Sequence, residues 1–203
     1  MSARAHVDLW WADLDAAAVG CGAGDPPALR RRRARRAILR NALSRYLDCR
    51  PGEIVLRRTD SGRPELEWPR SDLRFSASSS GATALFAVTR GEAIGVDVER
   101  ADHSAGLGGI AHLFLTPAER RMVAGVERDR REVALLRLWT LKEALGKAMG
   151  TGLAVDPTTL EVRPPWRRAM LATSGDVVAA LAREGAWGTC RQRRYGATPS
   201  AAV

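Results

Sequence analysis

Two long helical segments, each closed by glycine or proline, place the strongest constraint on how this chain can fold. The first is expected over about 26–47, where Asp25 is a good N-cap, prolines occupy the first turn and Pro-Gly follows at 51–52. The second is expected over about 129–149 and ends at the Gly-Thr-Gly run 150–152. Apolar residues recur at helical spacing along both segments. Each helix should therefore bury one face against another layer.

Short strand-like runs accompany both helices. Strands are expected at 6–12, 53–57, 73–78, 82–88 and 93–99 in the first part, and at 160–162 and 187–195 in the second. The runs 73–78, 82–88 and 93–99 are expected to form one antiparallel meander. A capping box at 116–119 begins a further short helix, and the tail from residue 197 is expected to be disordered. These patterns predict an α+β protein of two similar lobes, 1–92 and 93–203.

The composition narrows the class of protein. With 203 residues and 45% hydrophobic residues, the chain can bury a core, and it contains no apolar run long enough to span a membrane. The N-terminal residues lack an apolar signal core, so we expect a cytoplasmic protein. The three cysteines and three histidines show no metal-ligand spacing. The net charge of +9 attracts nucleic acid, phosphorylated cofactors or an acidic protein, without choosing among them.

Lysine is almost absent from this basic chain. All but two of the 32 basic residues are arginine, and the two lysines, Lys142 and Lys147, lie in the second long helix. Lysine carries a compact charge and a transferable proton, whereas arginine presents a planar fork that stays protonated. Lys147 is four residues after Glu143, so the two share one helix face. Lys142 is displaced around the helix from Glu143, and we expect it only to share the charge of the region. The alternative is that both lysines lie on a solvated surface.

Two carboxylates alternate along the expected strand 93–99. Asp97 and Glu99 are two residues apart and point to the same face, where they repel each other unless a cation lies between them. Magnesium suits such oxygen ligands and completes its shell with water and substrate phosphate. The alternative is the polar face of an edge strand. For Glu143 and Lys147 the alternative is a surface ion pair worth about 0.3–0.5 kcal/mol.

The segments 95–99 (GVDVE) and 139–147 (WTLKEALGK), about forty residues apart, resemble the two motifs of the Sfp-type 4'-phosphopantetheinyl transferases. Shorter segments extend the resemblance: 36–40 (RAILR), 62–64 (GRP), 75–80 (FSASSS) and 150–153 (GTGL). Together they cover roughly 28–155. Ser79 stands where the family has a histidine, the stretch before Arg31 is shorter than usual, and the segment after about 173 has no clear match.

The resemblance implies a monomer of two pseudo-symmetric α+β lobes with coenzyme A in the cleft between them. Asp97, Glu99 and Glu143 would bind Mg2+ together with the pyrophosphate of coenzyme A. A serine of an acyl or peptidyl carrier protein would attack, and 3',5'-ADP would leave. Lys147 would neutralise or protonate the leaving phosphate, and Glu143 is also a candidate base. The positions that match nucleotide-phosphate contacts in relatives are Arg31, Arg63, Ser78 and Ser79.

Two other functions remain open from the sequence. The charge would suit a nucleic-acid-binding protein, although no helix-turn-helix, zinc or RNA-binding motif is present. The chain could also be an inactive transferase-like protein that binds coenzyme A or a carrier domain, given Ser79 and the short N-terminal stretch. The leading prediction is a holo-[acyl-carrier-protein] synthase acting in polyketide or nonribosomal peptide synthesis, with no nucleic-acid or membrane partner.

Overall fold

The computed structural model describes residues 6–18, 24–59, 62–152, 155–160, 162–173 and 175–196. The longer elements, in chain order, are β1 (Val7–Asp13), α2 (Pro27–Ser44), β2 (Val55–Arg58), β3 (Pro64–Trp68), β4 (Leu73–Ser80), β5 (Thr83–Arg90), β6 (Ile94–Arg100), α4 (Pro117–Ala124), α5 (Arg131–Met149), β7 (Trp166–Met170), β8 (Val177–Glu184) and β9 (Cys190–Arg194). Short helical turns join them: α1 (Leu14–Ala17), η1 (Pro51–Glu53), η2 (Ala101–Ser104), α3 (Leu107–Ile110), η3 (Ala111–Leu113) and η4 (Arg128–Arg130). The α+β class is confirmed.

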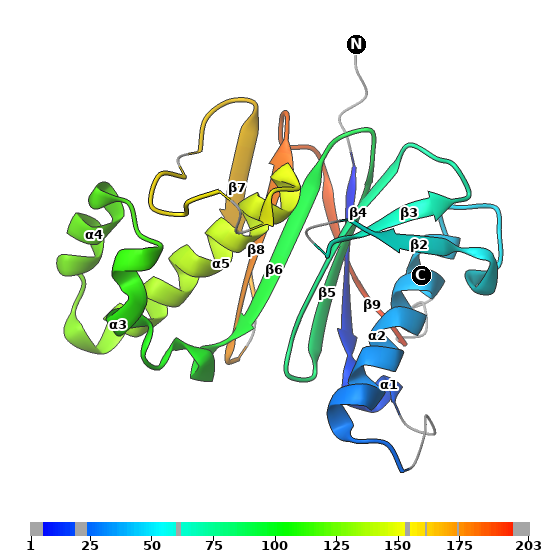
Figure 1. Cartoon of the computed structure of the whole chain (residues 1–203), viewed down its shortest axis with the longest axis horizontal. Coiled ribbons are helices and arrows are strands. Elements are labelled where there is room, and N and C mark those ends of the chain that lie inside the picture. Colours follow the sequence, from blue (N-terminus) through cyan, green and yellow to red (C-terminus); the bar gives the residue numbers. More distant parts are fainter. Residues whose placement is uncertain are drawn as a thin grey trace, which may run out of the picture.

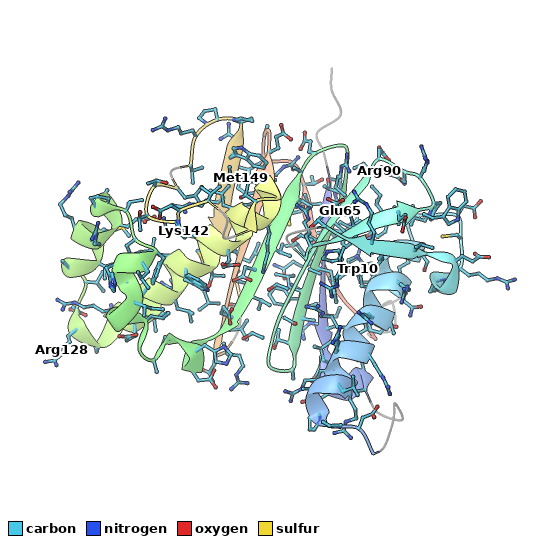
Figure 2. The ribbon with its side chains drawn as sticks, in the orientation of Figure 1. Trp10, Glu65, Arg90, Arg128, Lys142 and Met149 are labelled. Carbon is cyan, nitrogen blue, oxygen red and sulfur yellow. The ribbon has the colours of Figure 1, made fainter. Side chains whose placement is uncertain are left out.

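The first lobe is a helix packed on a sheet. Its sheet has the strand order β4-β5-β1-β9, and α2 covers one face (Figure 1). The buried stripe of α2, which includes Ile38 and Leu43, packs against Trp10 of β1 and Phe86 of β5. Figure 2 shows Trp10 between the sheet and the helix. The predicted helix therefore forms, but it ends at Ser44, earlier than expected.

The second lobe repeats this layout. Its sheet has the order β6-β8-β7, and α5 lies against it with Ala144, Leu145 and Ala148 in the contact. Gly150 ends the helix in a left-handed conformation, φ 76°, which glycine adopts without steric cost. The predicted end of this helix and the capping box at Thr116 are thus confirmed, and the helix begins at Arg131, just after the turn η4.

The two sheets face each other in the middle of the molecule (Figure 1). Leu9 and Leu85 of the first sheet pack against Val96 and Leu181 of the second. Strands of both sheets are therefore buried on two faces, one against the helix of their own lobe and the other against the opposite sheet. This explains why β8 was not predicted: a strand buried on both faces has a continuous apolar sequence and lacks the alternation of polar and apolar residues that marks a half-buried strand.

The predicted meander is wrong in its third strand. β4 and β5 do pair antiparallel, but β6 pairs with β8 in the other sheet. The edge of β6 that faces β4 is connected to β4 by hydrogen bonds from serine side chains and not by backbone hydrogen bonds between the strands. Ser76 Oγ accepts the Val96 N–H at 3.0 Å, and Ser80 Oγ accepts the Arg100 N–H at 3.2 Å. Serines at alternate positions of β4 therefore form a seam between the lobes.

The end of the chain differs most from expectation. Leu160 and Val162 are not in a strand, and residue 161 lies outside the described residues. The strand expected at 187–195 is confirmed in shorter form as β9, which pairs parallel with β1. The division into lobes 1–92 and 93–203 stays a prediction, and β9 lies in the sheet of the first range. The tail from 197 is outside the described residues. In the described part, none of the helices has the length and apolarity needed to cross a membrane.

Candidate functional site

The two motifs, 95–99 and 139–147, meet in one cleft of about 680 Å³ between the lobes. Its walls come from α2, β2, the segment before β3, β4, β6 and α5. The lining residues are Arg35, Arg58, Gly62, Arg63, Pro64, Ser76, Ala77, Ser78, Ser79, Asp97, Glu99, Trp139, Glu143, Gly146, Lys147, Gly150 and Gly152. Of the predicted site residues, only Arg31 is missing from this lining. A second hollow of about 500 Å³, near Trp11 and Arg194, contains none of the predicted residues.

Asp97 lies at the base of the cleft and is 2% exposed. Its Oδ1 accepts hydrogen bonds from Lys147 Nζ at 2.5 Å and from Ser78 Oγ at 2.7 Å. Lys147 Nζ also donates to Ser78 Oγ at 3.1 Å. Burial raises the pKa of Asp97 above its usual value, although Lys147 and Ser78 oppose the shift. The three groups thus connect α5, β4 and β6 at the seam.

Two carboxylate oxygens in the cleft accept no hydrogen bond. Among the described residues, Asp97 Oδ2 and Glu143 Oε1 are buried without a partner. Burial raises the pKa of Glu143, Lys147 lowers it, and the charges of Asp97 and Glu99 raise it further. Buried acceptors without donors are costly, so a group that binds them would stabilise the folded state.

Glu99 lies at the open side of the same group. Its Oε2 accepts a hydrogen bond from Ser80 Oγ at 2.8 Å and lies 3.1 Å from His103 Nδ1. His103 follows β6 by one short turn and was not among the predicted site residues. The spacing of four residues between Glu99 and His103 was the only signal in the sequence, and it becomes a contact only because the chain turns into η2.

The carboxylates fit a divalent cation in part. Asp97 and Glu143 each have an oxygen without a donor among the described residues, and Glu99 is close enough to raise the pKa of Glu143. A hard cation would neutralise the negative charge of such a group. In the part of the chain that the structure describes, no three Asp, Glu, His or Cys side chains come together as a complete protein metal site. Magnesium commonly uses one or two carboxylates and takes its other ligands from water and phosphate. The ligand set remains a prediction.

Arginines line the other end of the cleft. Arg35, one turn after the predicted Arg31, donates from Nη1 to Ser79 Oγ at 3.2 Å. Burial lowers the pKa of Arg35, and the positive charges of Arg58, Arg36 and Arg32 lower it further. In the described residues, neither Arg35 nor Arg58 is paired with a carboxylate. This end of the cleft is therefore suited to an anion.

The other predicted phosphate contacts lie differently. Arg31 donates from Nε and Nη2 to the two carboxylate oxygens of Asp15, each at 2.6 Å, and lies outside the cleft lining. Arg63 lines the cleft, but its guanidinium donates to backbone carbonyls. Ser78 is buried between Asp97 and Lys147. Sequence alone cannot separate Arg31 from Arg35, because both lie on one face of α2 and only the sheet opposite decides which enters the cleft.

The expectation for Lys142 is wrong. Lys142 is 3% exposed, and its Nζ lies 2.9 Å from Glu119 Oε2 and 2.7 Å from the carbonyl oxygen of Pro157 (Figure 2). Glu119 also accepts the Thr116 N–H at 2.9 Å, which completes the predicted capping box. Arg168 Nη2 lies 3.5 Å from the other oxygen of Glu119. Lys142 is therefore a buried structural cation away from the cleft, and the surface alternative fails for it.

Comparisons with known proteins agree with the two motifs. Residues 93–195 match the family model of the 4'-phosphopantetheinyl transferase superfamily. The chain is 32% identical over 173 residues to "4'-phosphopantetheinyl transferase HetI" of Nostoc sp., an alignment covering 79% of this chain and 73% of that protein. It is 27% identical over 126 residues to "4'-phosphopantetheinyl transferase" of Bacillus subtilis, covering 62% of this chain and 54% of that protein.

A third relative is also named as a phosphopantetheinyl transferase. The chain is 32% identical over 165 residues to "L-aminoadipate-semialdehyde dehydrogenase-phosphopantetheinyl transferase" of Eremothecium gossypii, covering 74% of this chain and 59% of that protein. The fold, the cleft and these matches define a transferase of two α+β lobes. The chain belongs to the 4'-phosphopantetheinyl transferase superfamily, and the predicted family is confirmed.

We expect Glu143→Gln to make the cation-free protein more stable. The change removes one negative charge from a group of carboxylates in which, among the described residues, Glu143 Oε1 and Asp97 Oδ2 have no donor. A gain of about 1 kcal/mol would raise Tm by roughly 2–4 °C. Magnesium should raise the Tm of the wild-type protein and have little effect on Glu143→Gln. Thermal unfolding with and without Mg2+ measures both.

The matched control is Glu127→Gln. Its carboxylate is 73% exposed and pairs only with exposed Arg130, so its loss should leave Tm and the response to magnesium unchanged. An equal magnesium-induced rise in wild type and Glu143→Gln would remove Glu143 from the cation site.

Proposed function

We propose that this protein transfers 4'-phosphopantetheine from coenzyme A to a serine of an acyl or peptidyl carrier protein and releases 3',5'-ADP. The observation that carries the proposal is the cleft: among the described residues, it contains a lysine, carboxylate oxygens without a hydrogen-bond donor and arginines without a carboxylate partner. Phosphoryl transfer depends mainly on positioning and charge neutralisation, which these groups can provide. The pathway we propose is polyketide or nonribosomal peptide synthesis.

We assign Asp97, Glu99 and Glu143 to Mg2+, which when bound would neutralise the pyrophosphate charge. Glu143 Oε1 accepts no hydrogen bond in the described residues and is our candidate acceptor for the proton of the attacking serine. Lys147, already bonded to Asp97, would place its positive charge beside the leaving phosphate.

For the nucleotide phosphates we propose Arg35 and Arg58 with Ser79. Arg35 already contacts Ser79, and neither arginine has a carboxylate partner among the described residues. Arginine binds phosphate oxygens through its planar fork, so two such side chains can replace a histidine at this place. The predicted contacts Arg31 and Arg63 are less suited: Arg31 binds both carboxylate oxygens of Asp15, and both Nη nitrogens of Arg63 donate to carbonyl oxygens. Arg58 is less engaged, since among the described residues it donates from Nη1 alone, to the carbonyl oxygen of Gly62 at 2.5 Å.

The net charge of +9 supports an acidic carrier protein as partner. Complementary charge mainly speeds the encounter of two proteins and weakens with added salt. We therefore expect the rate of transfer at low carrier concentration to fall as salt increases.

Intact mass measurement tests the proposal. Wild-type protein, apo carrier protein, Mg2+ and coenzyme A should give a carrier heavier by one phosphopantetheine, and Asp97→Ala or EDTA should abolish the gain. Transfer by Asp97→Ala at the wild-type rate would contradict the cation assignment. Coenzyme A binding without transfer to any apo carrier would favour an inactive relative. Salt-sensitive duplex binding that ignores coenzyme A would favour a nucleic-acid-binding protein.

Lys147→Arg should lower the turnover rate at saturating coenzyme A by at least about tenfold, roughly 1.4 kcal/mol of transition-state stabilisation. Lys147 Nζ lies 2.5 Å from Asp97 Oδ1, and the larger guanidinium of arginine cannot occupy the same position. In addition, arginine stays protonated and cannot give a proton to the leaving group. Turnover of Lys147→Arg and Lys147→Met is to be compared with wild type. If charge alone matters, the arginine variant will match wild type and only the methionine variant will fail.

A further inference from the structure

Arg63 belongs to the first lobe but ends against the second. It lies just before β3, and its Nη1 donates to the carbonyl oxygen of Lys147 in the last turn of α5. Its Nη2 donates to the carbonyl oxygens of Phe75 in β4 at 3.3 Å and of Ile94 in β6 at 3.4 Å. One side chain thus joins the three elements that carry Ser78, Asp97 and Lys147.

These contacts leave Arg63 poorly placed to bind an anion. Both Nη nitrogens donate to carbonyl oxygens. Nε has no hydrogen-bond partner among the described residues, but it is buried, so a phosphate could reach it only after the side chain moved. Arg35 differs, because its only hydrogen bond in the described residues is to the hydroxyl of Ser79. The two arginines therefore line one cleft but differ in their partners: Arg63 is bonded to backbone carbonyls, and Arg35 is free to bind an anion beside Ser79.

The carbonyl that Arg63 binds is one that the helix cannot satisfy by itself. Carbonyls in the last turn of a helix lack i+4 donors, and a positive charge there is favoured by the helix dipole. Among the described residues, the Lys147 carbonyl otherwise accepts only the Gly150 N–H, at 3.3 Å. The side chain of the same residue reaches Asp97 and Ser78. Fixing this carbonyl therefore fixes the starting point of the lysine side chain.

We propose that Arg63 is a positioning residue, which caps the C-terminal end of α5 from the opposite lobe and so holds Lys147 against Asp97. The inference rests on the proposed function, since its main readout is the rate of phosphopantetheine transfer. Small displacements of a catalytic group can lower the rate by about a hundredfold, so the effect should be large.

The experiment compares Arg63→Met with Arg35→Met, on coenzyme A and on 3'-dephospho-coenzyme A. Arg63→Met should lower kcat at least about tenfold on both substrates with little change in KM. Arg35→Met should instead raise KM for coenzyme A, and less for the dephospho form. A rise in KM confined to coenzyme A in Arg63→Met, with kcat unchanged, would overturn the inference and return Arg63 to phosphate binding.

Two further variants separate positioning from general damage. Arg63→Lys keeps the charge but not the planar fork that reaches three carbonyls, so it should not restore kcat. In a Lys147→Met background, Arg63→Met should cause little additional loss of kcat, because the group it positions is already gone. Additive losses would mean that Arg63 acts independently of Lys147.

Hydrogen exchange keeps the inference testable if the wild-type protein modifies no carrier. The Gly150 and Thr151 amides donate to the carbonyls of Lys147 and Gly146 at 3.3 and 3.1 Å. Both should exchange faster in Arg63→Met and at the wild-type rate in Arg35→Met. Unchanged exchange in Arg63→Met would show that the helix end does not depend on Arg63, whatever the outcome for transfer.

Discussion

Gly95→Ala is expected to destabilise the protein by about 3 kcal/mol or more and to abolish transfer with it. A Cβ at Gly95 would lie 2.0 Å from the carbonyl oxygen of Ala144 and 2.4 Å from the amide nitrogen of Ala148. Both atoms belong to the backbone of α5, which lies directly on β6 at this point. No side chain can turn away to make room, so the helix must move. Urea unfolding measures the loss.

Gly109→Ala is the matched control. A Cβ there meets nothing within 4 Å, and the backbone is not left-handed, so stability should change by about 1 kcal/mol or less. Wild-type stability of Gly95→Ala would show that α5 is not held against β6 as closely as the structure has it. The effect on activity follows because Asp97 is two residues further along β6 and Glu143 is adjacent to Ala144.

Lys142→Met should cost about 3 kcal/mol of folding free energy, because it leaves the mostly covered Glu119 carboxylate without its closest cation. The pair lies at 2.9 Å, with the lysine side chain 2% and the glutamate side chain 12% exposed. Adding Glu119→Gln should recover part of the loss: glutamine can still cap the Thr116 N–H, and no carboxylate is left without its lysine, although Arg168 loses its carboxylate partner. Urea unfolding of both single variants and the double variant measures this. Additive losses would contradict a coupled pair.

The same pair predicts a response to acid. Burial opposes ionisation, but the hydrogen bonds from Lys142 and from the backbone of Thr116 lower the pKa of Glu119 below its usual value. Its stabilisation is therefore present above the pKa of the unfolded chain and lost as pH falls through the lowered folded value. The Lys142→Met, Glu119→Gln protein should lose less stability than wild type over that interval. Identical acid profiles would assign the loss to other carboxylates.

Local signals carried much of the prediction. Gly150, in its left-handed conformation, ends α5 where expected, because caps depend on neighbouring residues alone. At α2 the prolines mark the start of the helix, but the expected cap is wrong: Pro26 is the N-cap, without a side-chain hydrogen bond, and the Asp25 carboxylate accepts a hydrogen bond from Arg33 instead. The two motifs and their spacing indicated the family, and the structure brings Asp97, Glu99 and Glu143 of these motifs into one cleft. Their roles as cation ligands stay predictions.

The errors share a physical cause, which is contact between residues far apart in the chain. β6 was assigned to the sheet of β4 because the two strands follow each other closely, yet its backbone pairs with β8. Lys142 was expected only to share the charge of the region around Glu143, with a solvated surface as the alternative, whereas the structure buries it against Glu119 on another helix. Neither partner is visible from the local pattern.

The sequence by itself determined the two long helices, the C-terminal end of α5, the α+β class and the two motifs, since these depend on short-range geometry and residue chemistry. Only the tertiary structure decided which arginine side chains face the cleft and which are bonded elsewhere in the protein. Arg31 pairs with Asp15, Arg35 meets Ser79, and Arg63 holds the end of α5. Long arginine side chains reach whatever acceptor the packing of the lobes brings near, and that packing is fixed by the burial of both sheets.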